Sequence, residues 1–99
     1  MPYELFATPA AAKLLKKLPD EVKAHLLSEL QILKNSPLAG QQLKGKLRVL
    51  RSFHTRYKNS DYRVAYQVRE AEQSITIWYV ATRENFYRQL EKLPLKLLR

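Results

Sequence analysis

The fold is decided by residues 48–68, which read RVLRSFHTRYKNSDYRVAYQV. Two runs rich in β-branched and aromatic residues flank residues 58–61 (KNSD), whose types favour a turn. Side chains alternate along a strand, so the apolar residues gather on one face of such a hairpin. His54, Arg56 and Arg63 then share the opposite face. The stretch therefore predicts a β-hairpin with one core face and one basic face.

The register of this hairpin gives the basic face a possible function. A symmetric turn about residues 59–60 sets Arg56 directly opposite Arg63, and His54 opposite Ala65. Like charges that face each other across an antiparallel pair are destabilising, so we expect the face to meet a polyanion. The alternative is a solvated face on which the arginine side chains splay apart and salt screens their repulsion.

Composition favours one basic domain. The 99 residues, 45% of them apolar, suit a single domain over residues 1–99 with a modest core. The net charge of +9 and the pI of about 10 indicate nucleic acid, an anionic membrane surface or an acidic protein as partner. No acidic residue lies between Glu29 and Asp61, so the positive charge concentrates on the hairpin and on the loop before it.

Several classes of protein are disfavoured by the residues that are missing. The sequence has no cysteine, which excludes disulfides and thiolate metal sites. Its two histidines, His25 and His54, are far apart, so neither a metal nor another cofactor is expected. No apolar run is long enough to span a bilayer, and residues 1–4 (MPYE) lack a signal-peptide pattern. We therefore expect a cytoplasmic protein that does not bind membranes.

The remaining elements predict an α+β fold. Thr8 and Pro9 are typical of a helix N-cap and first helical position. The expected order is an N-terminal strand, a helical hairpin packed on a mainly antiparallel sheet of about four strands, and a short C-terminal helix. This packing leaves the second face of the sheet free. The expected strands and helices cover residues 3–6, 10–18, 20–35, 48–57, 62–68, 74–81 and 86–93.

The sequence as a whole resembles a known family. The order of elements, together with residues 43–45 (LKG), 61–68 (DYRVAYQV) and 80–87 (VATRENFY), is similar to the RelE/ParE superfamily of toxins over almost the whole chain. RelE-type members are mRNA interferases that enter the ribosomal A site and cut the message there. ParE-type members poison DNA gyrase and lack the cutting residues. The resemblance implies a type II toxin whose partners are a cognate antitoxin, the ribosome and mRNA, with operon DNA bound only through the antitoxin complex.

The resemblance also implies roles for five residues. Arg63 matches the strand arginine that stabilises charge at the scissile phosphate, and Arg83 matches an arginine assigned to the phosphate or the leaving group. Tyr87 matches the tyrosine that packs on or orients a nucleotide. Arg56 lies where RelE-type toxins carry a basic residue, usually lysine. His54 departs from the pattern, because it lies where they carry the lysine that is the usual candidate for the general base.

The chemistry of RNA cleavage fits these residue types. The 2′-OH must lose a proton, which suits histidine, and the pentavalent phosphate needs cations, which suits arginine. The alternative for His54 is a polar surface residue, with the arginines supplying electrostatic stabilisation alone. The alternative for Tyr87 is a core residue beside Phe86 and Leu90.

Five further basic residues are expected to bind RNA, and the resulting affinity should fall steeply with salt. The rival functions are gyrase inhibition and RNA binding without toxicity. Charge reversal at two of the five, in the loop before the hairpin, is expected to weaken a ribosome-bound toxin but not a gyrase inhibitor. Arg63→Ala is expected to abolish toxicity with folding intact, because Arg56 repels Arg63. The five RNA-binding candidates are Lys44, Lys46, Arg48, Arg51 and Lys58.

Overall fold

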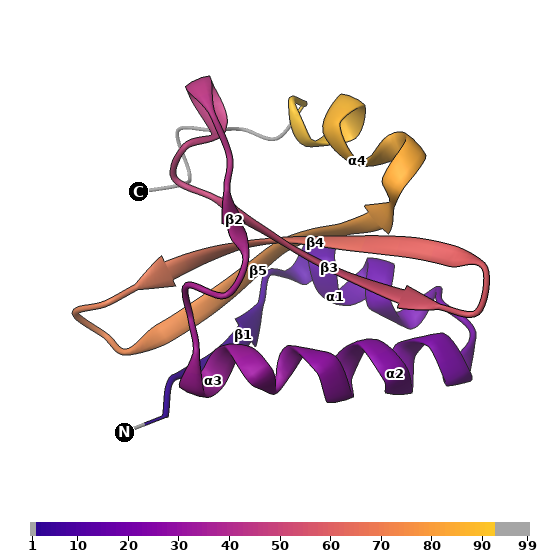
Figure 1. Cartoon of the computed structure of the whole chain (residues 1–99), viewed down its shortest axis with the longest axis horizontal. Coiled ribbons are helices and arrows are strands. Elements are labelled where there is room, and N and C mark those ends of the chain that lie inside the picture. Colours follow the sequence, from indigo (N-terminus) through magenta and orange to yellow (C-terminus); the bar gives the residue numbers. More distant parts are fainter. Residues whose placement is uncertain (1, 93–99) are drawn as a thin grey trace.

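The structure is a computed structural model that describes residues 2–92, and its α+β architecture is the one predicted (Figure 1). The predicted contribution of Leu93 to the last helix lies outside the described residues. The elements in chain order are β1 (Glu4–Ala7), α1 (Pro9–Lys16), α2 (Asp20–Leu30), α3 (Ile32–Asn35), β2 (Gln41–Gln42), the 3-10 turn η1 (Gly45–Leu47), β3 (Arg51–Tyr57), β4 (Ser60–Arg69), β5 (Ser74–Thr82) and α4 (Arg83–Leu90).

The sheet has five strands in the order β1-β5-β4-β3-β2. Strand β1 runs parallel to β5, and the other neighbours are antiparallel. The strand beyond the predicted four is β2, a two-residue segment within the expected loop, where Gln41 pairs with Ser52 of β3. This short pairing ties the loop before the hairpin to the edge of the sheet.

Helices α1, α2 and α3 cover one face of the sheet, and α2 and α3 run below the strands in Figure 1. The Thr8 hydroxyl accepts a hydrogen bond from the Ala11 N–H at 3.1 Å, so α1 begins as its capping residues predict. The predicted helix over residues 20–35 is two helices, because the Gln31 N–H bonds to the carbonyl of Ser28, three residues back. Their apolar faces meet Phe53, Val64, Tyr66, Ile75, Ile77 and Val80 of the sheet.

The second face of the sheet is not free, which corrects the prediction. Helix α4 and residues 43–50, which follow β2, pack on it, and α4 lies above the strands in Figure 1. Phe86 and Leu90 of α4 are fully buried there against Ala65 of β4. A register shift leaves Trp78 as the extra residue of β5, so Trp78 and Tyr79 both pack against this second cluster.

Helix α4 starts at Arg83, three residues before the predicted start at Phe86. Its N-cap is Thr82, the last residue of β5, so no loop separates the strand from the helix. Arg83 therefore stands in the first turn of α4, and Tyr87 follows one turn later. This junction fixes both candidate residues to regular elements.

Candidate functional site

The hairpin turns one residue earlier than predicted. Lys58 has a φ of 55°, in the left-handed region, and a two-residue turn at Lys58 and Asn59 leaves Tyr57 paired with Ser60. The predicted pairing of Arg56 with Arg63 is therefore wrong. Arg56 faces Asp61 instead, and the argument from a like-charge clash has no basis in this register.

The two faces of the hairpin are nevertheless those predicted. The change of register moves each cross-strand partner by two residues. Side chains two residues apart point to the same face of a strand, so the two faces keep their residues. His54 now lies directly opposite Arg63. Both side chains belong to the face that carries α4, and Phe53 and Val64 belong to the face that carries the helical hairpin.

Arg63 and Tyr87 form the centre of the candidate site. Nη1 of Arg63 donates to the Tyr87 hydroxyl at 3.5 Å, and Cζ of Arg63 lies 5.8 Å from the centroid of the Tyr87 ring. Nε of Arg63 is buried and has no hydrogen-bond partner in residues 2–92. Neither of the two ion pairs in this part of the chain involves Arg63. The guanidinium is thus held against an aromatic ring while part of its donor capacity is unused.

Tyr87 is a surface residue, so the core alternative for it is wrong. Its side chain is 46% exposed, whereas the adjacent Phe86 is fully buried. The two rings meet edge to face with their centroids 5.0 Å apart. Phe86 anchors α4 in the core, and Tyr87 presents a ring and a hydroxyl beside Arg63.

The other three candidate residues lie on the neighbouring strand β3 and at the start of α4. His54 is exposed on β3. Arg56 is 62% exposed; its Nη1 lies 3.3 Å from Oδ1 of Asp61, and its Nε donates to the Lys58 carbonyl at 3.3 Å. Arg83 is exposed and, together with Asp61, lines a polar hollow of about 270 Å³ between the hairpin turn and the start of α4.

Two of the five predicted RNA-binding residues also contact protein groups. Arg51 is half-buried, and its guanidinium donates to the carbonyls of Gly40 at 3.0 Å and Leu38 at 3.3 Å. Lys58 lies 3.5 Å from a carboxylate oxygen of Glu21 on α2. Arg51 therefore contacts the loop that leads to β2, and Lys58 contacts the helical side of the hairpin.

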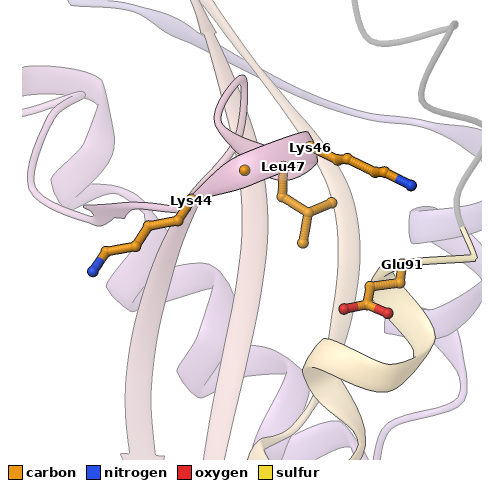
Figure 2. A pocket seen from close by; sticks show the side chains of 5 residues that line it. Lys44, Lys46, Leu47 and Glu91 are labelled. Carbon is orange, nitrogen blue, oxygen red and sulfur yellow. The ribbon is translucent and has the colours of Figure 1, made fainter.

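The other three predicted RNA-binding residues are exposed on or beside η1. Lys44 precedes this turn and Lys46 lies within it, and Figure 2 shows their side chains extending to opposite sides of it. Arg48 follows η1, and its carbonyl accepts a hydrogen bond from the Gln42 side chain at 3.0 Å. Lys44 and Lys46 line a groove that also reaches Glu91, just after α4.

Sequence reasoning missed the residues that hold the loop between α3 and β2 in place. The Tyr66 hydroxyl accepts from the Gly40 N–H and donates to the Pro37 carbonyl, both at 2.8 Å. Burial raises the pKa of Tyr66, although the Gly40 N–H and the nearby Arg51 oppose the shift. A Cβ at position 40 would lie 2.6 Å from the Tyr66 hydroxyl. The only sequence signal was that Gly40 is one of two glycines in the chain.

Two negative observations apply to residues 2–92. No group of three or more histidine, cysteine, aspartate or glutamate side chains lies close enough together there to hold a metal ion. The helices of this part of the chain are too short or too polar to cross a membrane. The two histidines lie toward opposite faces of the sheet, since His25 of α2 contacts Thr55 at 3.2 Å and His54 faces away.

Solved structures of toxins share this fold. A chain of the toxin–antitoxin complex RelBE2 from Mycobacterium tuberculosis is 28% identical, with a TM-score of 0.68, covering 84% of this chain and 100% of that chain. An arginine-to-alanine mutant of the toxin RelE from E. coli, in the free state, is 26% identical, with a TM-score of 0.75 and coverage of 92% and 94%. A chain of the archaeal RelE–RelB complex from Pyrococcus horikoshii, 23% identical over 84% and 97% with a TM-score of 0.60, shares the fold.

The family is shown by the sequence itself. No curated protein gives a significant match. Residues 5–91, however, match the family described as the ParE-like toxin of type II bacterial toxin–antitoxin systems, which is most of the chain. The predicted resemblance to the RelE/ParE superfamily is thereby confirmed. The chain belongs to the ParE-like toxins of type II toxin–antitoxin systems.

Proposed function

We propose that this toxin is a metal-independent endoribonuclease that cuts mRNA in the ribosomal A site and so inhibits translation. The observation that carries the proposal is the state of Arg63, whose Nε is buried without a partner in residues 2–92 while Nη1 contacts Tyr87. A buried donor left unpaired is costly, so this arginine is kept at the expense of stability. A phosphate would bind its terminal Nη groups, because Nε is closed off from solvent. A phosphate diester supplies the anionic acceptor oxygens that match a guanidinium.

The neighbouring residues supply the other parts of the reaction. His54, directly opposite Arg63, removes the proton from the ribose 2′-OH, whose oxygen then attacks the phosphorus. The bond to the 5′-oxygen breaks and this oxygen takes a proton from water, which leaves a 2′,3′-cyclic phosphate and a 5′-hydroxyl. Arg63 stabilises the negative charge of the pentavalent phosphate, and Arg83 stabilises the departing oxygen. Tyr87 offers its exposed ring to a base.

Arg56 has a supporting role in this proposal. Its ion pair with Asp61 and its bond to the Lys58 carbonyl hold the guanidinium beside the hairpin turn. Because the side chain is 62% exposed, this pair stabilises the fold by less than about 1 kcal/mol. Arg56 is therefore available to exchange Asp61 for a phosphate of the message.

The partners follow from the same proposal. The exposed Lys44, Lys46 and Arg48 would contact RNA of the ribosome, in the cytoplasm. The RelBE2 complex contains an antitoxin with its toxin, which supports a cognate antitoxin as the protein partner of this chain. Through that complex, and not alone, the toxin would reach operon DNA.

Gyrase inhibition is the second candidate, because the matching family is described as ParE-like. Arg56, Arg63, Arg83 and Tyr87 weigh against it, since an inhibitor without nuclease activity needs no phosphate-binding arginine beside a base-stacking ring. A supercoiling assay with purified gyrase separates the two functions directly.

The test is primer extension on a defined message that is held on ribosomes with an open A site. The antitoxin-free protein is expected to cut at the A-site codon with ribosomes, and not in a tube without them. His54→Ala is expected to slow cutting by about 10²-fold or more if His54 is the base. Cutting at full rate by His54→Ala would assign catalysis to the arginines alone. No cutting with ribosomes, combined with inhibited supercoiling, would overturn the proposal in favour of gyrase.

A further inference from the structure

Two buried side-chain polar atoms in residues 2–92 have no hydrogen-bond partner, and both belong to the β3–β4 hairpin. They are Nε of Arg63 and Oγ of Ser52. Such atoms are rare in folded proteins, and each is costly to keep. Nε–H of arginine is a donor, and a serine hydroxyl oxygen can accept. The two unpartnered atoms are therefore complementary in their chemistry.

The register of the hairpin makes these two residues diagonal neighbours. Ser52 of β3 pairs with Ala65 of β4, and the adjacent pair on the same face is His54 with Arg63. Both side chains belong to the face that carries α4. Diagonal Cβ atoms of an antiparallel pair lie about 7–8 Å apart or somewhat less, a gap that a long side chain can span. An arginine at position 63 is thus long enough to reach toward Ser52.

Tyr87 connects Arg63 to the part of the sheet that contains Ser52. Nη1 of Arg63 donates to the Tyr87 hydroxyl at 3.5 Å. Tyr87 in turn lines the same hollow as Gln41 of β2, and Gln41 is the residue that pairs with Ser52. The guanidinium therefore extends from β4 toward the strand that carries Ser52.

Phosphate binding makes an internal acceptor for Nε necessary. The Nη groups of Arg63 face the site, where Nη1 contacts an exposed tyrosine. Nε is closed off from solvent, so neither a phosphate in the site nor bulk water serves it. Its acceptor must come from inside the protein, and Oγ of Ser52 is the other unpartnered buried side-chain atom in the part of the chain that the structure describes.

We propose that Ser52 is a positioning residue for Arg63, whose Nε–H donates to the Ser52 hydroxyl, directly or through one ordered water, when phosphate binds the Nη groups. This inference rests on the proposed nuclease function and adds a residue to it. Because a guanidinium is planar, fixing Nε fixes the direction in which both Nη groups point. The contact with Tyr87 is long, so the guanidinium can leave it for the phosphate at little cost.

The proposal is tested by NMR with inorganic phosphate as the probe, which needs neither a ribosome nor cleavage. The ¹⁵N-labelled, antitoxin-free protein is titrated, and the Nε–H signal of Arg63 is assigned by its absence from Arg63→Lys. We expect saturating phosphate to shift this signal and to slow its exchange with water about tenfold, as a charge-assisted hydrogen bond does. In Ser52→Ala the exchange rate should be the same with and without phosphate.

Two further variants separate the hydroxyl from its surroundings. Ser52→Thr keeps a hydroxyl at this position and is expected to retain the slow exchange. Ser74→Ala is the matched control, because Ser74 is buried to the same 7% exposure but pairs with Arg69 at the far end of β4. We expect Ser52→Ala to cut ribosome-bound mRNA about tenfold more slowly at an unchanged Tm, and Ser74→Ala to cut at the full rate.

Failure of this inference and failure of the nuclease proposal give different results. A phosphate response of Arg63 that depends on Ser52, in a protein that does not cut mRNA, would refute the nuclease and leave an anion site. Full-rate cutting by Ser52→Ala, with an unchanged response of the Nε–H signal, would refute the role of Ser52 and leave the nuclease. A signal that does not respond to phosphate in the unmodified protein would also overturn the role of Ser52.

Discussion

Gly40→Ala is expected to destabilise the protein strongly, because the position has no room for a side chain. The added Cβ would lie 2.6 Å from the hydroxyl and 2.7 Å from Cε1 of Tyr66, and 2.8 Å from the carbonyl oxygen of Ser52. Tyr66 is fully buried and Ser52 presents a backbone atom, so neither neighbour yields easily. The methyl group must therefore push the loop away from the sheet.

The magnitude follows from the bonds that this movement breaks. The Gly40 N–H to Tyr66 bond and the Tyr66 to Pro37 bond are both 2.8 Å long, and each contributes about 1 kcal/mol. Overpacking adds about 1–3 kcal/mol, and the lower entropy of unfolded alanine returns up to about 1 kcal/mol. The free energy of unfolding should fall by about 3 kcal/mol, which for a chain of this size lowers Tm by about 12–24 °C.

Thermal unfolding followed by circular dichroism measures this effect, and Gly45→Ala is the matched control. Gly45 has a φ of 63°, yet a Cβ there would meet no atom within 4 Å. Its substitution should cost only about 1 kcal/mol of backbone strain. The reasoning is refuted if Gly40→Ala unfolds within about 3 °C of the unmodified protein, or if the two variants lose equal stability.

Two smaller effects concern the turn and the pH dependence of stability. Lys58→Asn is expected to raise the free energy of unfolding by roughly 0.5 kcal/mol in urea titrations, because asparagine tolerates a φ of 55° better than lysine does; a loss of stability would count against the turn. Burial raises the pKa of Tyr66, so its contribution to stability is complete below the unfolded-state value near 10 and is lost as the pH rises through the folded-state value. Tyr66→Phe should therefore flatten the alkaline fall in Tm, and an unchanged slope would contradict this.

Local chemistry explains which elements were predictable. Thr8 and Pro9 determine the start of α1 through contacts within one helical turn, so the sequence alone locates it. The alternation of apolar residues likewise identified the two faces of the β3–β4 hairpin. These features depend on neighbours that are close in the sequence.

Features that depend on distant partners were not predictable in the same way. The register depends on Lys58 adopting a left-handed φ, which residue preferences disfavour, so the turn was placed one residue late. The packing of α4 on the second sheet face joins Phe86 to Ala65, and the groove joins Lys44 to Glu91. Such pairs leave no periodic signal in the sequence.

The candidate site likewise has one feature that was predictable and one that was not. His54 and Arg63 were predicted to share a face, and they do. Arg56 was predicted to pair with Arg63 but pairs with Asp61, which changes the reason for testing Arg63. Repulsion by Arg56 no longer explains why Arg63→Ala should keep its fold. The explanation is that Nε makes no hydrogen bond in residues 2–92 and the bond to Tyr87 is long, so little is lost on truncation.

The most direct test compares two arginines of β4. Arg63 and Arg69 are both half-buried and share one face of the strand, but Arg69 pairs with Ser74 at the far end, away from Tyr87. The rate of cutting of ribosome-bound mRNA is measured for both alanine variants beside their Tm values. We predict that Arg63→Ala lowers the rate by about 10²-fold or more with little change in Tm, and that Arg69→Ala cuts normally. Equal cutting by the two variants, or loss of folding in Arg63→Ala, would contradict the assignment of Arg63 to the scissile phosphate.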